Sequence, residues 1–151
     1  MKQSDDERAM MMLEKAVYHA KDLLEETKHF NPFSMVMTDT EEIEFYENKE
    51  KDTLQSYALL EEGLRVRIKK GNVNISVLAV DTKIPDKFVK EIAMGIRIHI
   101  EEKSQIDKKI SAKYIYVPYE LCRVGEGEMF VKLHTPHAVG FPAEYIVKEG
   151  E

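Results

Sequence analysis

Residues 95–102, GIRIHIEE, alternate apolar and polar side chains almost without exception. Because successive side chains of a β-strand point to opposite faces of its sheet, a period of two predicts a strand that has one apolar and one polar face. The apolar face would carry three isoleucines, and the polar face three potentially reactive side chains: Ile96, Ile98 and Ile100 on one side, Arg97, His99 and Glu101 on the other. Any fold of this chain must therefore bury one face of a sheet at this segment.

The first forty-odd residues predict a helix followed by a β-hairpin. Ser4 with Glu7 three positions later has the form of a capping box, and apolar residues recur behind it at intervals of three and four, which predicts a helix over residues 5–29. Pro32 would end this helix, since proline disfavours the α conformation in the residue before it. Residues 33–38 and 43–47 alternate again and predict a hairpin.

A second helix is predicted from Asp52, which is followed three positions later by Gln55 in the manner of an N-cap. Residues 64–70 also alternate with period two, so the alternative is a shorter helix that ends at Gly63 and is followed by a strand. The longer helix is favoured because its apolar spacing continues through Gly63, although a glycine inside a helix costs about 1 kcal/mol.

Strands are predicted at residues 72–80, 94–102, 111–119 and 128–134. The first of these has few polar residues and should lie in the centre of the sheet, whereas Pro118 suggests that the third ends there or lies at an edge. Residues 135–151 are rich in turn residues and are predicted to form an irregular tail.

This order of elements predicts the fold class. Short turns between strands favour an antiparallel sheet, and helices interspersed among such strands are typical of α+β proteins. We therefore expect residues 1–151 to form a single α+β domain without a linker, in the order α-β-β-α-β-β-β-β. Its sheet would have about five or six strands, with both helices packed on one face.

Composition limits the partners and the location of the protein. No apolar run approaches the ~20 residues that span a bilayer, and the start MKQSDDERAMMML is too acidic for a secretory signal. The single cysteine, Cys122, cannot form an internal disulfide. The net charge is −6, and the basic residues are interleaved with acidic ones, unlike the basic surfaces that bind nucleic acid. We expect a cytoplasmic protein that binds neither membrane nor nucleic acid.

The polar face of the predicted sheet is the main candidate for a functional surface. With both helices on the isoleucine side, this face would remain uncovered, and tyrosine, phenylalanine and arginine are enriched at protein interfaces. A sheet face also suits a two-fold contact. The sequence therefore predicts a binding or assembly module that forms a homodimer through this face. The predicted interface residues are Tyr46, Arg97, His99, Tyr114, Tyr116 and Phe130.

Three alternatives for this face remain open. It could be an ordinary solvated surface, or it could serve a small hydrolase-like enzyme that uses His99 with Glu101 or Arg97 for acid–base chemistry in a cleft formed by a dimer. Residues two apart on one strand are about 7 Å apart, so a direct hydrogen bond between His99 and Glu101 is not expected without a bend. The third alternative is a small-ligand sensor that uses Arg97 and the tyrosines.

His134 and His137 are the residues of the sequence that could suggest a metal site. Zinc usually takes three or four protein ligands, and the missing ones would have to come from Cys122 or Glu128. The sequence also lacks the phosphate-loop, dinucleotide, serine-hydrolase and zinc-protease motifs. We therefore predict neither a metal site nor a cofactor.

Three features of residues 52–133 form a pattern: a helix followed by a strand that ends in Asp81, the alternating run that closes on Glu101, and a strand that ends in Pro118 and Tyr119. In this pattern the chain resembles an uncharacterised family of small bacterial proteins. Members of that family often have histidine after the glutamate, whereas this chain has Glu102. The resemblance implies no activity and supplies no catalytic residues.

Overall fold

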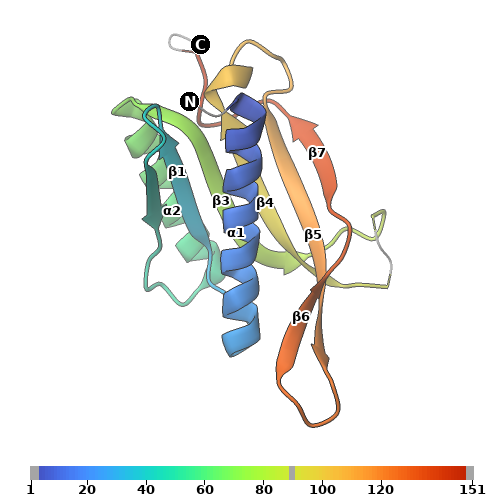
Figure 1. Ribbon diagram of the computed structural model, residues 1–151. Helices are drawn as coiled ribbons and strands as arrows, with labels where there is room; N and C mark the ends of the chain where they lie inside the picture. The colour runs from blue at the N-terminus through green and yellow to red at the C-terminus, as the bar shows by residue number, and fades with distance from the viewer. Residues whose placement is uncertain (1–3, 89–90, 149–151) are drawn as a thin grey trace.

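The computed structural model describes residues 4–88 and 91–148. Within these ranges a seven-stranded antiparallel sheet packs between two helices (Figure 1), so the predicted α+β class is confirmed. The sheet order is β2-β1-β3-β4-β5-β6, and β7 also pairs with β5. In chain order the elements are α1 (Asp5–Thr27), β1 (Phe33–Thr38), β2 (Ile43–Tyr46), α2 (Thr53–Lys69), β3 (Val73–Lys83), β4 (Met94–Glu102), a 3-10 turn (Lys103–Gln105), β5 (Ala112–Arg123), β6 (Met129–Leu133) and β7 (His137–Phe141).

Helix α1 begins at Asp5, as its sequence predicts, and ends at Thr27, two residues before the predicted end. The Ser4 hydroxyl accepts a hydrogen bond from the Glu7 backbone N–H at 3.2 Å, and the Glu7 carboxylate accepts one from the Ser4 N–H, which completes the capping box. Alanines at 16 and 20 lie on its buried face. Their small side chains let the helix approach the sheet closely.

Helix α2 extends to Lys69, so the alternative of a strand at residues 64–70 is wrong. The Asp52 side chain caps the helix by accepting from the Gln55 N–H at 3.0 Å. Gly63 faces solvent, and a Cβ atom there would meet nothing within 4 Å, so this glycine breaks no packing. Neither helix of the described ranges is long and apolar enough to cross a membrane.

The two helices lie on opposite faces of the sheet, and the prediction that both pack on one face is wrong (Figure 1). Neighbouring residues of the same strand face different helices: Val77 packs in the cluster under α1, whereas Leu78 packs in the cluster under α2. Both faces of β1 and of most of β3 are buried. A strand that is buried on both faces requires a layer on each side, and β3 accordingly lies in the centre of the sheet, as predicted.

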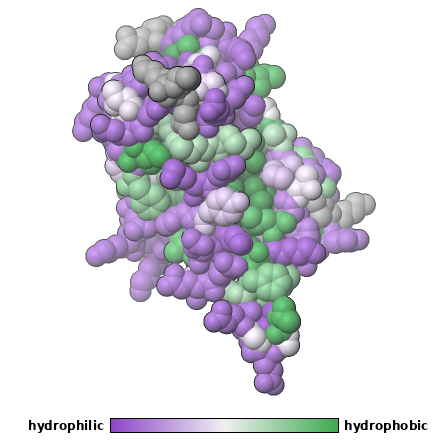
Figure 2. Space-filling model, viewed as in Figure 1, coloured by the Kyte–Doolittle hydropathy of each residue, from purple (hydrophilic) through white to green (hydrophobic). Residues whose placement is uncertain are grey.

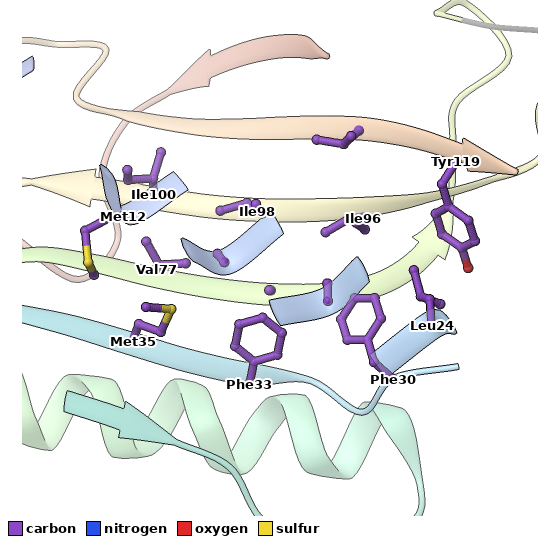
Figure 3. Close-up of a cluster of buried hydrophobic side chains, with 14 of the residues drawn as sticks. Met12, Leu24, Phe30, Phe33, Met35, Val77, Ile96, Ile98, Ile100 and Tyr119 are labelled. Atoms are coloured by element: carbon purple, nitrogen blue, oxygen red, sulfur yellow. The ribbon is translucent and has the colours of Figure 1, made fainter. Parts of the chain in front are cut away.

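The larger core lies between α1 and the sheet (Figure 3). Ile96, Ile98 and Ile100 are all buried there, which confirms the predicted sidedness of β4. They pack with side chains from α1, β1 and β3, for example Met12, Phe33 and Val77.

Strand β5 continues through Pro118 to Arg123, so the prediction that it ends or lies at an edge there is wrong. On one side β5 pairs first with β7, as far as Tyr116, and then with β6, from Tyr119 onward. The Pro118 carbonyl faces this side, since it accepts a hydrogen bond from the His134 N–H at 2.9 Å. The N–H that proline lacks would point the same way, into the break between β6 and β7, so no ladder bond is lost.

The tail predicted to be irregular contains strand β7 and a segment that returns to the core. Residues 137–141 pair with β5, although Pro136, Gly140 and Pro142 hide the strand signal in the sequence. The segment after β7 buries Tyr145 and Ile146 beside α2. The C-terminal residues therefore contribute to the second core.

Candidate ligand-binding site on the α2 face

The polar face of β4 is covered at one end. Helix α2 packs on β1 and β3, and the segment 142–148 lies over the end of β4 that carries His99 and Glu101. The prediction of an uncovered face is therefore wrong for these two side chains, which are 2% and 1% exposed. Only Arg97, at the other end, keeps partial access to solvent.

His99 and Glu101 contact each other directly, contrary to the expectation from strand geometry. The His99 Nε2 and Glu101 Oε2 atoms are 2.6 Å apart. The expectation of about 7 Å describes the separation of their positions along the strand. These two long side chains lean toward each other along β4 and close that gap.

The Glu101 carboxylate is fully occupied by hydrogen bonds. Besides His99, it accepts from three successive backbone N–H groups of the C-terminal segment: Glu144 at 2.9 Å, Tyr145 at 2.9 Å and Ile146 at 2.8 Å. A carboxylate has about four lone-pair positions, so none is left for another donor. Burial raises the pKa of Glu101, but the hydrogen bonds from His99 and from the segment outweigh it and bring the pKa below its ordinary value. Glu101 thus fastens the C-terminal segment to β4.

The His99 ring is enclosed by aromatic side chains. Its centroid lies 5.3 Å from that of Tyr114, 5.0 Å from Phe141 and 4.9 Å from Tyr145. The Nδ1 atom is buried and has no hydrogen-bond partner in the described ranges. In this structure neither His99 nor Glu101 reaches a surface where it could contact a substrate.

Arg97 lies between two tyrosine rings on the same face. Its guanidinium carbon is 4.6 Å from the ring centroid of Tyr114 on β5 and 5.4 Å from that of Tyr57 on α2. The Arg97 Nη2 atom donates a hydrogen bond to the Tyr57 hydroxyl oxygen, 3.0 Å away. Burial raises the pKa of Tyr57 to about 12, against the opposing effect of Arg97, so this hydroxyl is neutral at physiological pH.

The charge of Arg97 is not balanced by a carboxylate. Among the described residues, no ion pair or hydrogen bond joins its guanidinium to an aspartate or glutamate, and the Nε atom is buried without a partner. Glu61, which lies nearby on α2, is engaged with the Tyr145 hydroxyl at 2.6 Å. An arginine offers five N–H donors, and buried charges are normally paired. Several donors of Arg97 are therefore free to bind an anion.

Further aromatic side chains extend from Arg97 across the sheet. Tyr116 stands opposite Arg97 on β5, and the Phe88 ring lies 5.4 Å from that of Tyr116. The His137 ring of β7 stacks on Phe88 at 5.1 Å and 17°. All are half-buried. We name these residues the Arg97 cluster: Arg97, Tyr57, Phe88, Tyr114, Tyr116 and His137.

The sequence identified only part of this cluster. The period-two pattern placed Arg97, Tyr114 and Tyr116 on one face, as the structure does. Phe88 was missed because it lies in the loop before β4, and Tyr57 because it lies within the second predicted helix, away from the strands. His137 had been considered for metal binding, but its ring packs on Phe88.

Tyr46 and Phe130 do not belong to the cluster. They lie on the two outer strands, β2 and β6, at opposite ends of the strand order. The Tyr46 hydroxyl donates to Glu44, which is paired with Arg67 at 2.7 Å. Arg67 and the Tyr46 hydroxyl together lower the pKa of Glu44 to about 2. The six predicted interface residues thus form no single exposed surface.

The predicted metal candidates are held by different partners. His134 Nε2 is 2.7 Å from Glu120 Oε1, whereas His137 belongs to the Arg97 cluster. Cys122 is half-buried on β5, and Glu128 is exposed. In the part of the chain that the structure describes, no group of three or more His, Cys, Asp or Glu could hold a metal ion.

A third histidine–carboxylate pair, after His99–Glu101 and His134–Glu120, lies at the end of α1. His29 Nδ1 is 3.2 Å from Asp81 Oδ2, and the Tyr119 hydroxyl donates to Asp81 Oδ1 at 2.7 Å. This group borders an open cleft of about 440 Å³. In the sequence, His29 is the last residue of the predicted helix 5–29, and Asp81 and Tyr119 are features of the resemblance, but no pattern suggests that the three meet.

No protein-family model matches this chain, and neither does any curated protein or solved structure in the comparisons. The geometry of the Arg97 cluster therefore carries the functional argument by itself.

Proposed function

We propose that this protein is a binding module that recognises a small anionic ligand through the Arg97 cluster. One observation carries the proposal: the Arg97 guanidinium is half-buried between two tyrosines and lacks a carboxylate partner within the described ranges. Leaving a charge unbalanced in such a place costs free energy. A ligand that supplies the missing negative charge recovers that cost on binding.

The chemistry of the cluster favours a planar ligand that bears a carboxylate or phosphate group. A guanidinium binds such groups through paired N–H donors. The Tyr116 and Phe88 rings beside it offer faces on which a second ring can stack, with a typical contribution of about 0.5–1.5 kcal/mol for an aromatic pair. Lys87, whose Nζ lies 5.1 Å from the Phe88 ring, adds another positive charge.

Adenosine monophosphate and benzoate are suitable test ligands, since one carries a phosphate and the other a carboxylate on a planar ring. We expect wild-type protein to bind at least one of them in isothermal titration. Arg97→Gln should weaken binding by about 1.5–3 kcal/mol, the range for a charged hydrogen bond, and Arg97→Lys should weaken it less.

The matched control is Arg123→Gln, which removes an exposed arginine at the far end of β5. It changes the net charge by the same amount and should leave binding unaltered. Absence of binding by both ligands, or equal binding by the Arg97→Gln variant, would contradict the proposal.

We further propose that the module works in the cytoplasm, as a homodimer and without nucleic acid. The single cysteine and the net charge of −6 support the location and the lack of nucleic-acid binding. The sheet face first considered for the dimer contains the buried His99, which favours a contact between the two copies on a different surface.

A further inference from the structure

The flank of α1 that faces β5 and β6 borders an apolar groove. Its cavity measures about 320 Å³ and is lined by α1 on one side and by β5, β6 and the turn at Pro136 on the other. Figure 2 shows hydrophobic side chains gathered in a strip beside α1. At the rim of the groove, Met10 is 56% exposed and Tyr18 is 57% exposed.

The groove exists because a single helix, α1, is too narrow to cover the whole of this face of the seven-stranded sheet. The buried stripe of α1 packs on the middle of the sheet, and Ile115 and Leu133 lie beyond it, only partly buried. A second stripe of α1 lies beside the buried one and lines the groove. Its residues are three or four positions apart, as neighbours on one side of a helix are: Met10, Leu13, Glu14, Val17 and Tyr18. Helix α1 is thus apolar on two neighbouring sides.

We infer that a second copy of this chain fills the groove, with the two α1 helices antiparallel across a two-fold axis near Val17 and Tyr18. The charges on the stripe support this occupant. Glu14 and Lys21 are seven residues apart, about 10.5 Å along the helix, and lie on the same flank. Neither side chain has an ion-pair partner in the described ranges.

The antiparallel arrangement brings these two charges together twice. When the axis passes between Val17 and Tyr18, Glu14 of one copy stands opposite Lys21 of the other, and Lys21 opposite Glu14. A two-fold contact needs a surface that is complementary to itself, and this stripe meets that condition. A lipid surface, by contrast, would require a basic rim, whereas Glu14 is the charged residue that lines the groove.

This dimer is independent of the Arg97 cluster, because α1 and the cluster lie on opposite faces of the sheet. Loss of one function should therefore leave the other intact. Ligand titration and mass measurement report on the two proposals separately.

Sedimentation equilibrium in the micromolar range tests the inference. Wild-type protein should have twice the chain mass of 17.5 kDa. Glu14→Lys places like charges opposite each other and should weaken the dimer by at least about tenfold. The double variant Glu14→Lys with Lys21→Glu reverses both charges and should restore the wild-type dissociation constant.

Two further variants complete the experiment. Tyr18→Glu, at an exposed position, should also give monomers that keep the wild-type circular dichroism spectrum and cooperative melting. Leu54→Glu, at an 82% exposed position on α2, is the control and should remain dimeric. A monomeric wild-type protein, a dimer that survives Tyr18→Glu, or a charge reversal that fails to restore association would each overturn the inference.

Discussion

The two ends of one strand face differ in how their polar groups are satisfied. Glu101 accepts four hydrogen bonds and is closed to solvent, whereas Arg97, on the same face of the same strand, lacks an anion among the described residues. The sequence pattern treats them alike. What separates them is the C-terminal segment, which returns from more than forty residues away to cover one end and leaves the other open. The covered end stabilises the fold, and the open end is available for binding.

The largest expected effect is on stability, at the covered end. Glu101→Ala would leave His99 and three backbone N–H groups buried without their acceptor. A buried donor left without its acceptor typically costs about 1–3 kcal/mol, so we expect a loss of several kcal/mol in the free energy of unfolding, measured with urea. Arg97→Gln, which breaks no ion pair, should cost less than about 1 kcal/mol. Equal losses in the two variants would erase the contrast between the ends.

The second effect is a loss of stability in acid. The folded-state pKa of Glu101 lies below its ordinary value of 4.5. Its contribution to stability is therefore complete above that value and disappears as the pH falls through the lower, folded-state pKa. Urea midpoints recorded from about pH 7 to about pH 3 should fall at the acid end. They should fall less steeply in Glu101→Gln, and identical slopes would argue against the assignment.

A matched pair of hydroxyl deletions sharpens the comparison further. Tyr145→Phe removes the donor to Glu61 at the covered end and should cost about 1 kcal/mol of stability. Tyr57→Phe removes the hydroxyl that holds Arg97. It should change ligand affinity more than stability, as calorimetry and urea unfolding of both variants would show. A larger stability loss for Tyr57→Phe than for Tyr145→Phe would reverse the expected order.

The smallest effect is expected at the edge of the sheet, where Glu44 pairs with Arg67. Although the pKa of Glu44 is lowered to about 2, both side chains are partly exposed, and water and salt weaken such pairs. Glu44→Gln should therefore cost less than about 1 kcal/mol and lose even that in high salt. A salt-independent loss above this range would indicate a stronger interaction than exposed pairs provide.

Local signals in the sequence were sufficient for most elements. The caps at Ser4 and Asp52 and the alternation around Ile98 predicted both helices and the buried side of β4 correctly. These signals depend on neighbours a few residues apart. The layering depended instead on the burial of both faces of β1 and β3. Local alternation does not reveal this, because Ser34, Thr38 and Ser76 are buried polar residues on the face toward α2.

The site was less accessible to prediction because its parts meet through long-range contacts. Arg97, Tyr114 and Tyr116 follow from strand alternation, since they lie on adjacent strands. Other features depend on a loop and a C-terminal segment whose positions no local periodicity encodes. These features are the burial of the three side chains, the contact of Phe88 with Tyr116, and the hydrogen bonds to Glu101. The burial of His99 does not follow from the sequence for the same reason: the residues that enclose it include Phe141 and Tyr145.

The most direct test of the central contrast is a nuclear magnetic resonance titration with adenosine monophosphate and benzoate. We expect the Arg97 Nε–Hε signal and the rings of Tyr116 and Phe88 to shift and saturate with at least one of these ligands, while the backbone N–H signals of Glu144, Tyr145 and Ile146 stay in place. Saturating shifts at the Glu101 end with an unchanged Arg97 signal would contradict the account, as would a spectrum that neither ligand alters.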